Sequence, residues 1–245
     1  MSDNLRGKVA VVTGGAVRVG RAIALALADA GCDLLIHYGR SQEPAQQTKA
    51  DAEASGVRAV THAADLADPA AVQGVIPAAL EQLGRVDILV NSAAIFLEGN
   101  LAATSLEDWD KQFAINLRAP FLLSQALAQH TPADGEAQII NVTDARVFRP
   151  APDHFAYRLT KSALVTMTET LALDLAPRIR VNAVALGAIM PPPGEDEAYL
   201  QKLAQEQVPL RRAGSAAIVA DNVLHLARQR FVTGVTLKLD GGQFL

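Results

Sequence analysis

The stretch that decides the fold is "KVAVVTGGAVRVGRAIALALADAG", residues 8–31, where an apolar run leads through glycines into an Ala- and Leu-rich run. We expect a strand, a turn at Gly14 and Gly15, and a helix that begins at Gly20. Glycines permit this turn and let the backbone approach a pyrophosphate, whose charge the helix N-terminus stabilises. Arg18 stands where such loops often carry their middle glycine. The stretch therefore predicts a dinucleotide-binding loop with a cation inside it.

The same alternation of strand-like and helix-like segments continues along the chain. Several of the short runs are continuously apolar, which is typical of parallel strands covered on both faces. We expect strands at 8–14, 32–38, 57–63, 86–93, 137–143, 179–185 and 234–240, and helices at 20–30, 44–55, 69–82, 106–130, 154–176 and 215–228. Asp68 is expected to cap the helix that Pro69 begins, and Gly84 to follow the end of that helix. This pattern predicts an α/β fold: a single Rossmann-type doubly wound domain over 1–245, with a seven-stranded, mostly parallel sheet and helices on both faces.

One irregular stretch, 186–214, separates the sixth expected strand from the last expected helix. Three consecutive prolines stiffen it, and its acidic middle could carry a short helix. Ligands of open α/β sheets bind beyond the carboxyl ends of the strands, so this stretch is placed to cover a ligand. A plain surface loop is the alternative.

Composition excludes several classes of function. The 245 residues carry a net charge of -4, and their lysines and arginines are scattered, which argues against nucleic-acid binding. No apolar run approaches the roughly 20 residues of a membrane helix, and no secretory signal is recognisable. Cys32 is the single cysteine, which fits a reducing compartment, and the histidines show no metal-ligand spacing. We expect a cytoplasmic protein without a metal, whose partners are a small-molecule substrate and other copies of itself.

The end of the second expected strand reads "IHYGRS", residues 36–41. NAD-binding folds place a carboxylate there for the ribose 2′-hydroxyl, whereas this segment offers Arg40, Ser41 and His37. A 2′-phosphate requires a cation and hydrogen-bond donors, so these residues and Arg18 favour NADP over NAD. Solvated surface charges are the alternative interpretation of each one.

Tyr157 and Lys161 lie four residues apart in "FAYRLTKSAL" and share one face of an expected helix. A lysine beside a tyrosine stabilises the phenolate, so the phenol can give up a proton near neutral pH. This helix follows the strand "AQIINVTD", whose carboxyl end would lie beside the nucleotide.

With this pair the chain resembles the short-chain dehydrogenase/reductase family over nearly its whole length. The resemblance rests on "TGGAVRVG", "ADL" at 64–66, "NSAA" at 91–94, "FAINL" with Asn116, "YRLTK", "RVNAVALGAI" at 180–189 and "LDGG" at 239–242. Together with the cations above, it implies cofactor contacts at Gly14, Arg18, Val19, Gly20, His37, Tyr38, Arg40, Ser41, Asp65, Leu66, Asn91, Ala93, Tyr157, Lys161, Gly187 and Ile189. It also implies that Asn116 anchors a water that links Lys161 to solvent.

The departures from that family indicate a branch within it. Thirteen residues before its tyrosine the family usually has a serine, and this chain has Asp144. A carboxyl suits a substrate that is protonated on nitrogen or offers N–H donors. Arg18, "HYGRS", Asp144 and Phe96 together resemble the pteridine reductase and dihydromonapterin reductase branch, in which an aromatic ring stacks on the pterin. The alternatives are a helix-capping or loop carboxylate for Asp144 and a lid-packing ring for Phe96.

These observations predict an NADPH-dependent reductase that transfers hydride to a C=N bond of a dihydropterin. Asp144, Tyr157, Lys161 and Asn116 would be catalytic, and Phe96, Asp144 and Tyr157 would bind substrate. Lys161 would hold the nicotinamide ribose and lower the pKa of Tyr157. An NADPH-dependent carbonyl reductase of the 3-oxoacyl-carrier-protein type and a non-catalytic NADPH-binding regulator remain alternatives. A homotetramer is expected, because the helices at 106–130 and 154–176 are apolar on more than one face and related enzymes pair them.

Overall fold

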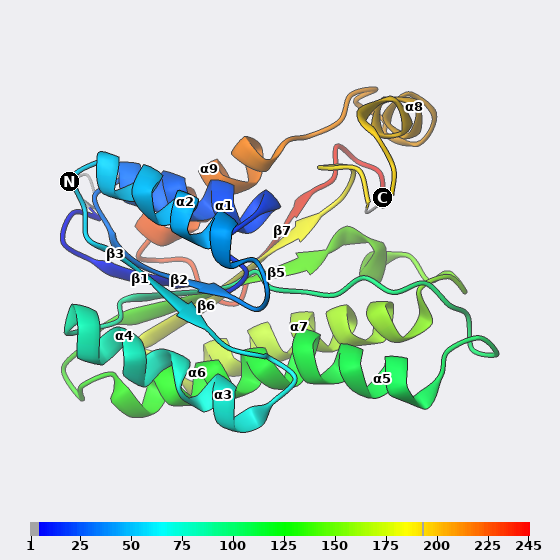
Figure 1. The fold of residues 1–245 in the computed structure, drawn as a ribbon. Coiled ribbons are helices and arrows are strands. Elements are labelled where there is room, and N and C mark those ends of the chain that lie inside the picture. Colours follow the sequence, from blue (N-terminus) through cyan, green and yellow to red (C-terminus); the bar gives the residue numbers. More distant parts are fainter. Residues whose placement is uncertain (1–4, 193) are drawn as a thin grey trace.

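Seven parallel strands form the centre of the computed structural model, which describes residues 5–192 and 194–245 (Figure 1). The sheet order is β3-β2-β1-β4-β5-β6-β7, and all neighbouring strands in the described residues pair in parallel. The strands are β1 (Val9–Val12), β2 (Asp33–Tyr38), β3 (Ala59–Ala63), β4 (Ile88–Asn91), β5 (Ala137–Asp144), β6 (Ile179–Leu186) and β7 (Thr236–Leu239). The predicted fold class is therefore confirmed, with a sheet that is wholly parallel in the described residues.

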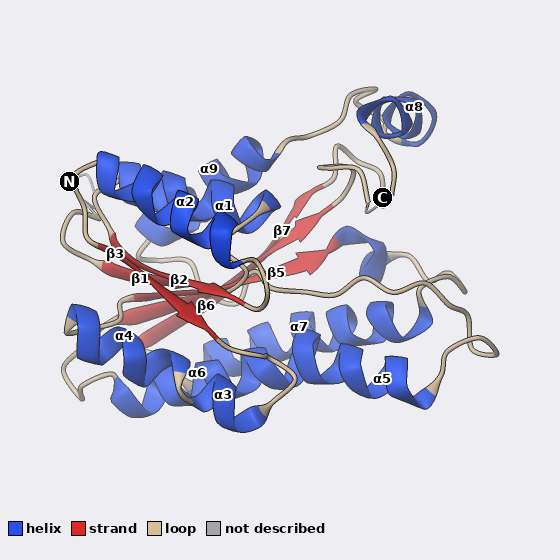
Figure 2. Ribbon diagram, in the orientation of Figure 1, coloured by secondary structure: helices blue, strands red, loops and turns tan. Residues whose placement is uncertain are grey.

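Helices cover both faces of this sheet (Figure 2). One face carries α1 (Arg18–Asp29), α2 (Gln42–Ala54) and α9 (Ala216–Arg228). The other side carries α3 (Pro69–Gln73), α4 (Val75–Leu83), α5 (Leu106–Phe113), the π-helical turn η1 (Ala114–Arg118), α6 (Ala119–His130) and α7 (Phe155–Asp174). The 3₁₀ turn η2 (Ala145–Phe148) follows β5, and α8 (Glu197–Gln207) lies near the C-terminus beyond the carboxyl ends of β5 to β7.

Two expected helices are divided. The segment predicted at 69–82 breaks at Gly74, which ends α3 and precedes α4. The segment predicted at 106–130 contains η1, and such π-helical turns are frequent at functional sites. The expected caps are present: the Asp68 side chain accepts from Ala70 N, and Gly84 adopts the left-handed conformation with φ of 87°.

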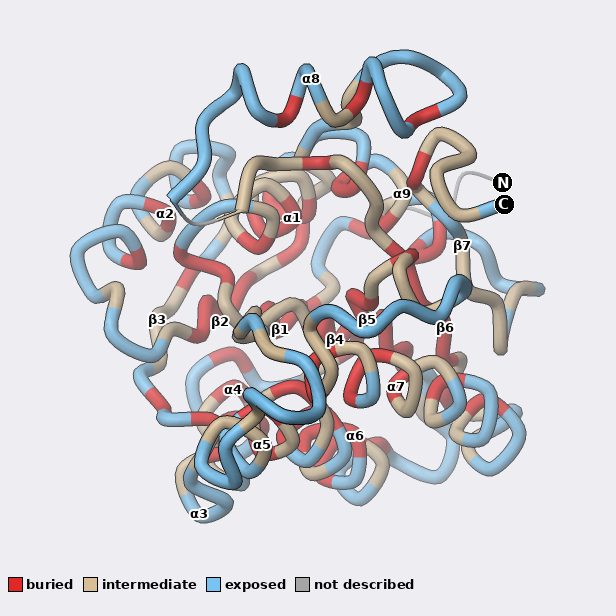
Figure 3. Tube along the Cα trace, turned by 90° about the vertical axis from the view of Figure 1, so that its right-hand side faces the viewer, coloured by how far each residue is buried: buried red, intermediate tan, exposed pale blue. Residues whose placement is uncertain are grey.

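The continuous apolar runs are explained by a core on each face of the sheet. In β1, Ala10 and Val12 pack with the core beneath α1 and α9, whereas Val9 and Val11 pack with the core beneath α4 and α6. Figure 3 looks onto the carboxyl edge of the sheet and shows the buried residues concentrated along the strands, with α8 largely exposed above them. None of the described helices is long and apolar enough to cross a membrane.

Strand length positions the chemistry. The strands β5 and β6 have 8 residues each, whereas β1 and β4 have 4. Asp144, the last residue of β5, pairs with Leu186 at the end of β6. This longer pair carries Asp144 to the carboxyl edge, where ligands of such sheets bind.

Candidate active site

The glycine loop between β1 and α1 leaves no room for side chains at its turn. A Cβ at Gly20 would collide with the carbonyl oxygen of Gly14, and a Cβ at Gly14 would lie 3.0 Å from Ala93 Cα. Gly14 has a φ of 64°, in the region that favours glycine. The bare backbone therefore presents the start of α1 to the cavity beside it, which fits a nucleotide pyrophosphate.

Arg18 takes the position of the middle glycine at a conformational cost. Its φ is 53°, a left-handed value that disfavours a residue with a Cβ by about 1 kcal/mol or more. Its Nη2 donates to the carbonyl oxygen of Pro191 at 2.6 Å, which joins the glycine loop to the segment before α8.

His37 supports the glycine loop instead of facing a phosphate. The residue is 2 % exposed, and its Nδ1 accepts from Gly14 N at 3.1 Å. Its Nε2 lies 3.0 Å from the carbonyl oxygen of Ala64, so the proton belongs on Nε2. Burial lowers the pKa of His37, which keeps the ring neutral. Both ring nitrogens of His37 therefore have partners within the protein, which leaves Arg18, Arg40 and Ser41 as the better-placed candidates for the 2′-phosphate.

Arg40 and Ser41 lie in the β2–α2 connection, next to the glycine loop. Gly15 N donates to the carbonyl oxygen of His37 at 3.0 Å, and Thr48 Oγ1 on α2 donates to that of Ala16 at 3.1 Å. These bonds hold the two segments together. Ser41 occupies the N-cap position of α2 without a capping bond, and Arg40 is exposed.

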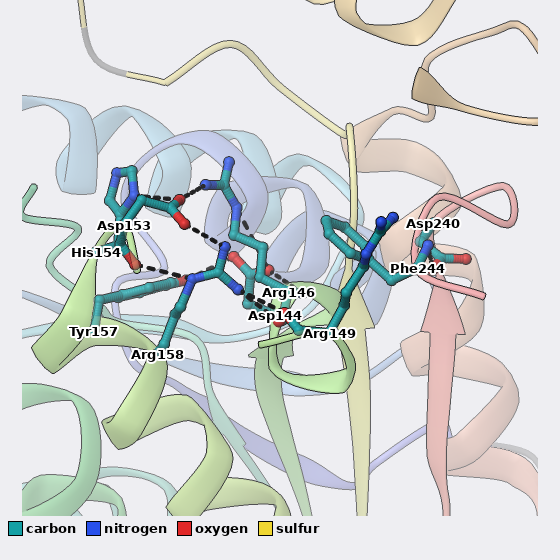
Figure 4. Close-up of polar contacts among 9 residues, drawn as sticks. All are labelled: Asp144, Arg146, Arg149, Asp153, His154, Tyr157, Arg158, Asp240 and Phe244. Atoms are coloured by element: carbon teal, nitrogen blue, oxygen red, sulfur yellow. Dashed lines mark hydrogen bonds and ion pairs between the residues drawn. The ribbon is translucent and has the colours of Figure 1, made fainter. Parts of the chain in front are cut away.

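Asp144 at the end of β5 meets Tyr157 of α7 (Figure 4). The Tyr157 hydroxyl donates to Asp144 Oδ2 at 3.0 Å, and Asp144 Oδ1 accepts from Arg146 N at 2.8 Å. The second bond caps η2, so Asp144 is at once a turn cap and a partner of Tyr157. The two interpretations of Asp144 are therefore compatible.

Burial and the carboxylate dominate the electrostatics. Burial, followed by the charge and hydrogen bond of Asp144, raises the pKa of Tyr157 well above its usual value, while Arg146 and Arg158 lower it. Burial lowers the pKa of Lys161 to about 8, opposed by Asp144, and its Nζ donates to the carbonyl oxygen of Val142 at 2.8 Å. Burial first, and then Asp144, therefore set the direction of the Tyr157 shift, and the lowering of this pKa by Lys161 stays a prediction.

Asn116 lies in η1 and is fully buried. Its Oδ1 accepts from Ile95 N at 2.9 Å, and its Nδ2 donates to the carbonyl oxygen of Ile95 at 3.0 Å. The side chain thus fixes the segment that leads to Phe96. The water that would link Asn116 to Lys161 stays a prediction.

Phe96 forms part of the wall next to Tyr157. Its ring meets the Tyr157 ring edge-on, with centroids 4.7 Å apart, and stacks on His154 at 4.2 Å. The guanidinium carbon of Arg146 lies 5.2 Å from the centroid of Phe96. The ring is thus both packed against neighbours and part of the cavity wall.

A cavity of about 720 Å³ extends from the glycine loop to Asp144 and Tyr157. The predicted residues that line it are Gly14, Arg18, Val19, Gly20, Ala93, Phe96, Asp144, Tyr157, Lys161, Gly187 and Ile189. The predicted residues outside this lining are His37, Tyr38, Arg40, Ser41, Asp65, Leu66, Asn91 and Asn116. In the described residues, no group of three His, Cys, Asp or Glu side chains could hold a metal ion.

Sequence reasoning missed several wall residues. Arg146, Tyr199 of α8, and Gln243 and Phe244 near the C-terminus also line the cavity. Gln243 Oε1 is buried without a hydrogen-bond partner, which leaves an acceptor open to a ligand. No local motif marks these positions; only the approach of distant segments reveals them.

Known proteins resemble this chain over nearly its whole length. Residues 15–243 match a family model described as enoyl-(acyl carrier protein) reductase. The 3-oxoacyl-[acyl-carrier-protein] reductase FabG of Staphylococcus epidermidis (strain ATCC 12228 / FDA PCI 1200) is 33% identical over 97% of this chain and 99% of its own. The uncharacterized oxidoreductase YohF of Escherichia coli is 33% identical over 97% of this chain and 96% of its own.

Solved structures of similar proteins also match nearly the whole chain. FolM alternative dihydrofolate reductase 1 of Brucella canis, complexed with NADP, has a TM-score of 0.94 and 34% identity, covering 100% of this chain and 96% of that one. A short-chain dehydrogenase of Burkholderia cenocepacia, also with NADP, has a TM-score of 0.91 and 37% identity, covering 99% and 100%.

Proposed function

This chain belongs to the short-chain dehydrogenase/reductase family, and we propose that within it the chain is an NADPH-dependent reductase of a dihydropterin. The observation that carries the proposal is the hydrogen bond of 3.0 Å between Tyr157 and Asp144 in a cavity that Phe96 also lines. A carboxylate accepts from N–H groups, and an aromatic ring suits a flat heteroaromatic substrate. A pterin has both features.

NADP(H) is the cofactor, in keeping with the NADP-bound relatives. The bare turn at Gly14 and Gly20 would hold its pyrophosphate, and Arg18, Arg40 and Ser41 would hold its 2′-phosphate. Lys161 and the open acceptor of Gln243 would meet its nicotinamide half. When bound, NADPH supplies the hydride.

Protein side chains supply the proton and orient the substrate. Because the pKa of Tyr157 is raised, its hydroxyl stays protonated at neutral pH and is a donor. Asp144 Oδ1 is held by Arg146 N, so Oδ2 is the oxygen left to accept from a substrate N–H. Tyr157 would then turn its proton from Oδ2 to a ring nitrogen of the substrate.

The decisive experiment follows NADPH oxidation with dihydrobiopterin, dihydromonapterin and an acetoacetyl thioester. We expect turnover of a dihydropterin by the wild type, and loss of that turnover with retained or increased thioester reduction in Asp144→Ser. Turnover of the thioester alone would show that the pterin assignment is wrong. Unchanged pterin reduction in Asp144→Ser would remove Asp144 from the mechanism.

A carbonyl reductase of the 3-oxoacyl-carrier-protein type is the second candidate. It is favoured by the FabG relative, which matches nearly the whole chain. Tyr157 and Lys161 would serve a ketone equally well. The same substrate panel separates the two functions.

We further propose that 186–214 covers the substrate and that the chain forms a homotetramer. Met190, Tyr199 and Leu203 of this segment line the cavity, which supports a covering role. Leu106 of α5 and Leu173 of α7 are 75 % and 85 % exposed, which supports association through these helices. Light scattering that gives a monomer mass would refute the tetramer.

A further inference from the structure

We propose that Asp153 is a positioning residue that aligns both substrate-binding walls of the cavity: the carboxylate of Asp144 through Arg146, and the ring of Phe96 through His154. The inference rests on the proposed function, since it names the device that orients the proposed pterin contacts. Asp153 lies in the segment between η2 and α7, and no motif marks it.

Asp153 has three side-chain partners, all beside the active site (Figure 4). Its Oδ1 accepts from Arg158 Nη2 at 2.8 Å, and its Oδ2 lies 3.0 Å from His154 Nδ1 and 3.5 Å from Arg146 Nη1. Burial opposes ionisation, but the hydrogen bonds from His154 and Arg158 and the charge of Arg158 hold the pKa of Asp153 below its usual value. The carboxylate is therefore charged at neutral pH, as its exposure of 46% also favours.

The first arm runs through Arg146 to the carboxylate that meets the substrate. Arg146 N donates to Asp144 Oδ1 at 2.8 Å, and its Nε lies 3.9 Å from the same oxygen. The guanidinium thus bridges two carboxylates, Asp144 in the cavity and Asp153 behind it. This bridge leaves Asp144 Oδ2 directed at Tyr157.

The second arm runs through His154 to the aromatic wall. The imidazole stacks on Phe96 with an interplanar angle of 19°, and Asp153 holds its Nδ1. His154 has a φ of 49°, an unfavourable conformation for this residue, so the surrounding contacts must hold it. The guanidinium carbon of Arg146 lies 5.2 Å from the centroid of the Phe96 ring. Phe96 therefore contacts both arms, His154 of the second and Arg146 of the first.

Arg158 fixes the segment to which Asp153 belongs. Its Nη1 donates to the carbonyl oxygens of Arg146 at 2.7 Å and Arg149 at 3.2 Å, and its Nε donates to that of Asp153 at 2.9 Å. Arg158 follows Tyr157 on α7 and is only 13% exposed. The helix that carries the proton donor therefore also anchors both arms.

The experiment separates the arms by steady-state kinetics with NADPH and dihydrobiopterin. Arg146→Gln should lower kcat several-fold, because Asp144 loses the guanidinium that lies 3.9 Å from its Oδ1, although the bond from the backbone N of residue 146 remains. His154→Gln should raise KM several-fold, about fivefold, with kcat nearly unchanged, because Phe96 loses its support in the ground state as well. Asp153→Asn, which keeps the shape and removes the charge, should show both effects.

Two further variants test whether the effects share one path. The double variant Asp153→Asn with Arg146→Gln should have a kcat within about twofold of the worse single variant, because both remove the same link. Asp153→Glu should restore part of the lost kcat. Arg149→Gln is the matched control: it removes the same charge as Arg146→Gln from the same segment. The Arg149 side chain makes no hydrogen bond or ion pair among the described residues, so kcat and KM should stay at the wild-type values.

Several outcomes would overturn the inference. These are unchanged kcat and KM in folded Asp153→Asn, additive losses in the double variant, or an equal response in Arg149→Gln. If Asp153→Asn does not fold, the absence of a kcat-against-KM split between Arg146→Gln and His154→Gln overturns it. The NADPH dissociation constant, from cofactor fluorescence, should stay within about twofold, because no arm reaches the glycine loop.

Failure of the proposed function is visible separately. A wild type that reduces only the acetoacetyl thioester refutes pterin reduction without involving any Asp153 variant. The variants are then assayed on the thioester, where a change of kcat in either direction in Arg146→Gln and Asp153→Asn, absent in Arg149→Gln, supports the inference, and no change overturns it.

Discussion

The two ends of the cavity are built on different principles. The cofactor end is made of backbone: Gly14 and Gly20 leave out side chains, and the neutral ring of His37 holds the turn from behind. The substrate end is made of side chains, with Tyr157 bonded to Asp144 and ions arranged around the pair. The absence of side chains shapes the cofactor end, whereas charges and individual hydrogen bonds set the properties of the substrate end.

The difference follows from what each end must recognise. A pyrophosphate is bound by N–H groups and a helix terminus, which any sequence supplies once the chain can approach closely enough. A substrate that receives a proton requires a donor whose protonation state is set by its surroundings. Changes at the substrate end should therefore affect catalysis, and changes at the cofactor end should affect affinity and folding.

The strongest test of this contrast removes the Tyr157 hydroxyl. Tyr157→Phe should lower kcat by about 10²- to 10⁴-fold, because it removes the proposed proton donor. Among the described residues, the Tyr157 hydroxyl is the side-chain group that donates to Asp144 Oδ2. NADPH affinity, measured by fluorescence titration, should stay close to that of the wild type. A comparable loss of affinity would show that the two ends are not separable.

The next test exchanges the charge that we propose for the cofactor's 2′-phosphate. Arg40→Asp should move the NADPH/NADH preference in kcat/KM by about 10- to 100-fold toward NADH, because a charge-assisted bond is lost and a repulsion is added. Lys49→Asp on α2 makes the same change in net charge and should leave the ratio alone. An unchanged ratio in Arg40→Asp would refute the phosphate assignment.

A single methyl group tests the role of space. Gly20→Ala places a Cβ against the carbonyl oxygen of Gly14, and such overpacking costs about 1–3 kcal/mol of unfolding free energy. We expect a lower Tm and weaker NADPH binding. Gly39→Ala is the matched control, since a Cβ there meets nothing within 4 Å. Equal stability of the two variants would contradict the tight turn.

The pH dependence of catalysis gives a further test. Lys161 has a pKa of about 8 in the folded chain, so its ammonium is lost above that pH, while Tyr157 keeps its proton. The kcat/KM of the free enzyme should fall by up to about tenfold per pH unit above 8. Lys161→Arg, with a permanent charge, should lose this limb. A wild type without a limb near 8 would show that Lys161 is not the titrating group.

The lowered pKa of Lys161 also predicts the direction in which the free energy of unfolding changes with pH. Its folded pKa of about 8 lies below the ordinary 10.5, so the unfolded chain binds more protons between these values. The contribution of Lys161 to unfolding free energy should therefore rise with pH across this window and be least favourable below 8. Denaturation of the wild type and of Lys161→Met, compared at pH 7 and 9.5, measures it.

The sequence by itself determined the alternating elements, the glycine turn and the pairing of Tyr157 with Lys161 on α7. Apolar runs, glycines and a four-residue spacing are local signals, and each acts through neighbouring residues. The sequence also marked Asp144 as a departure from its family, although it left open whether the residue caps a turn or meets a substrate.

Only the tertiary structure decided how these groups behave. It turned His37 inward, brought Gln243 into the cavity wall, and placed Asp144 within 3.0 Å of Tyr157, so that the pKa of the tyrosine rises although a lysine lies one turn away. Burial and the approach of distant segments set these properties. They depend on distances between atoms far apart in the chain, which a local pattern does not encode.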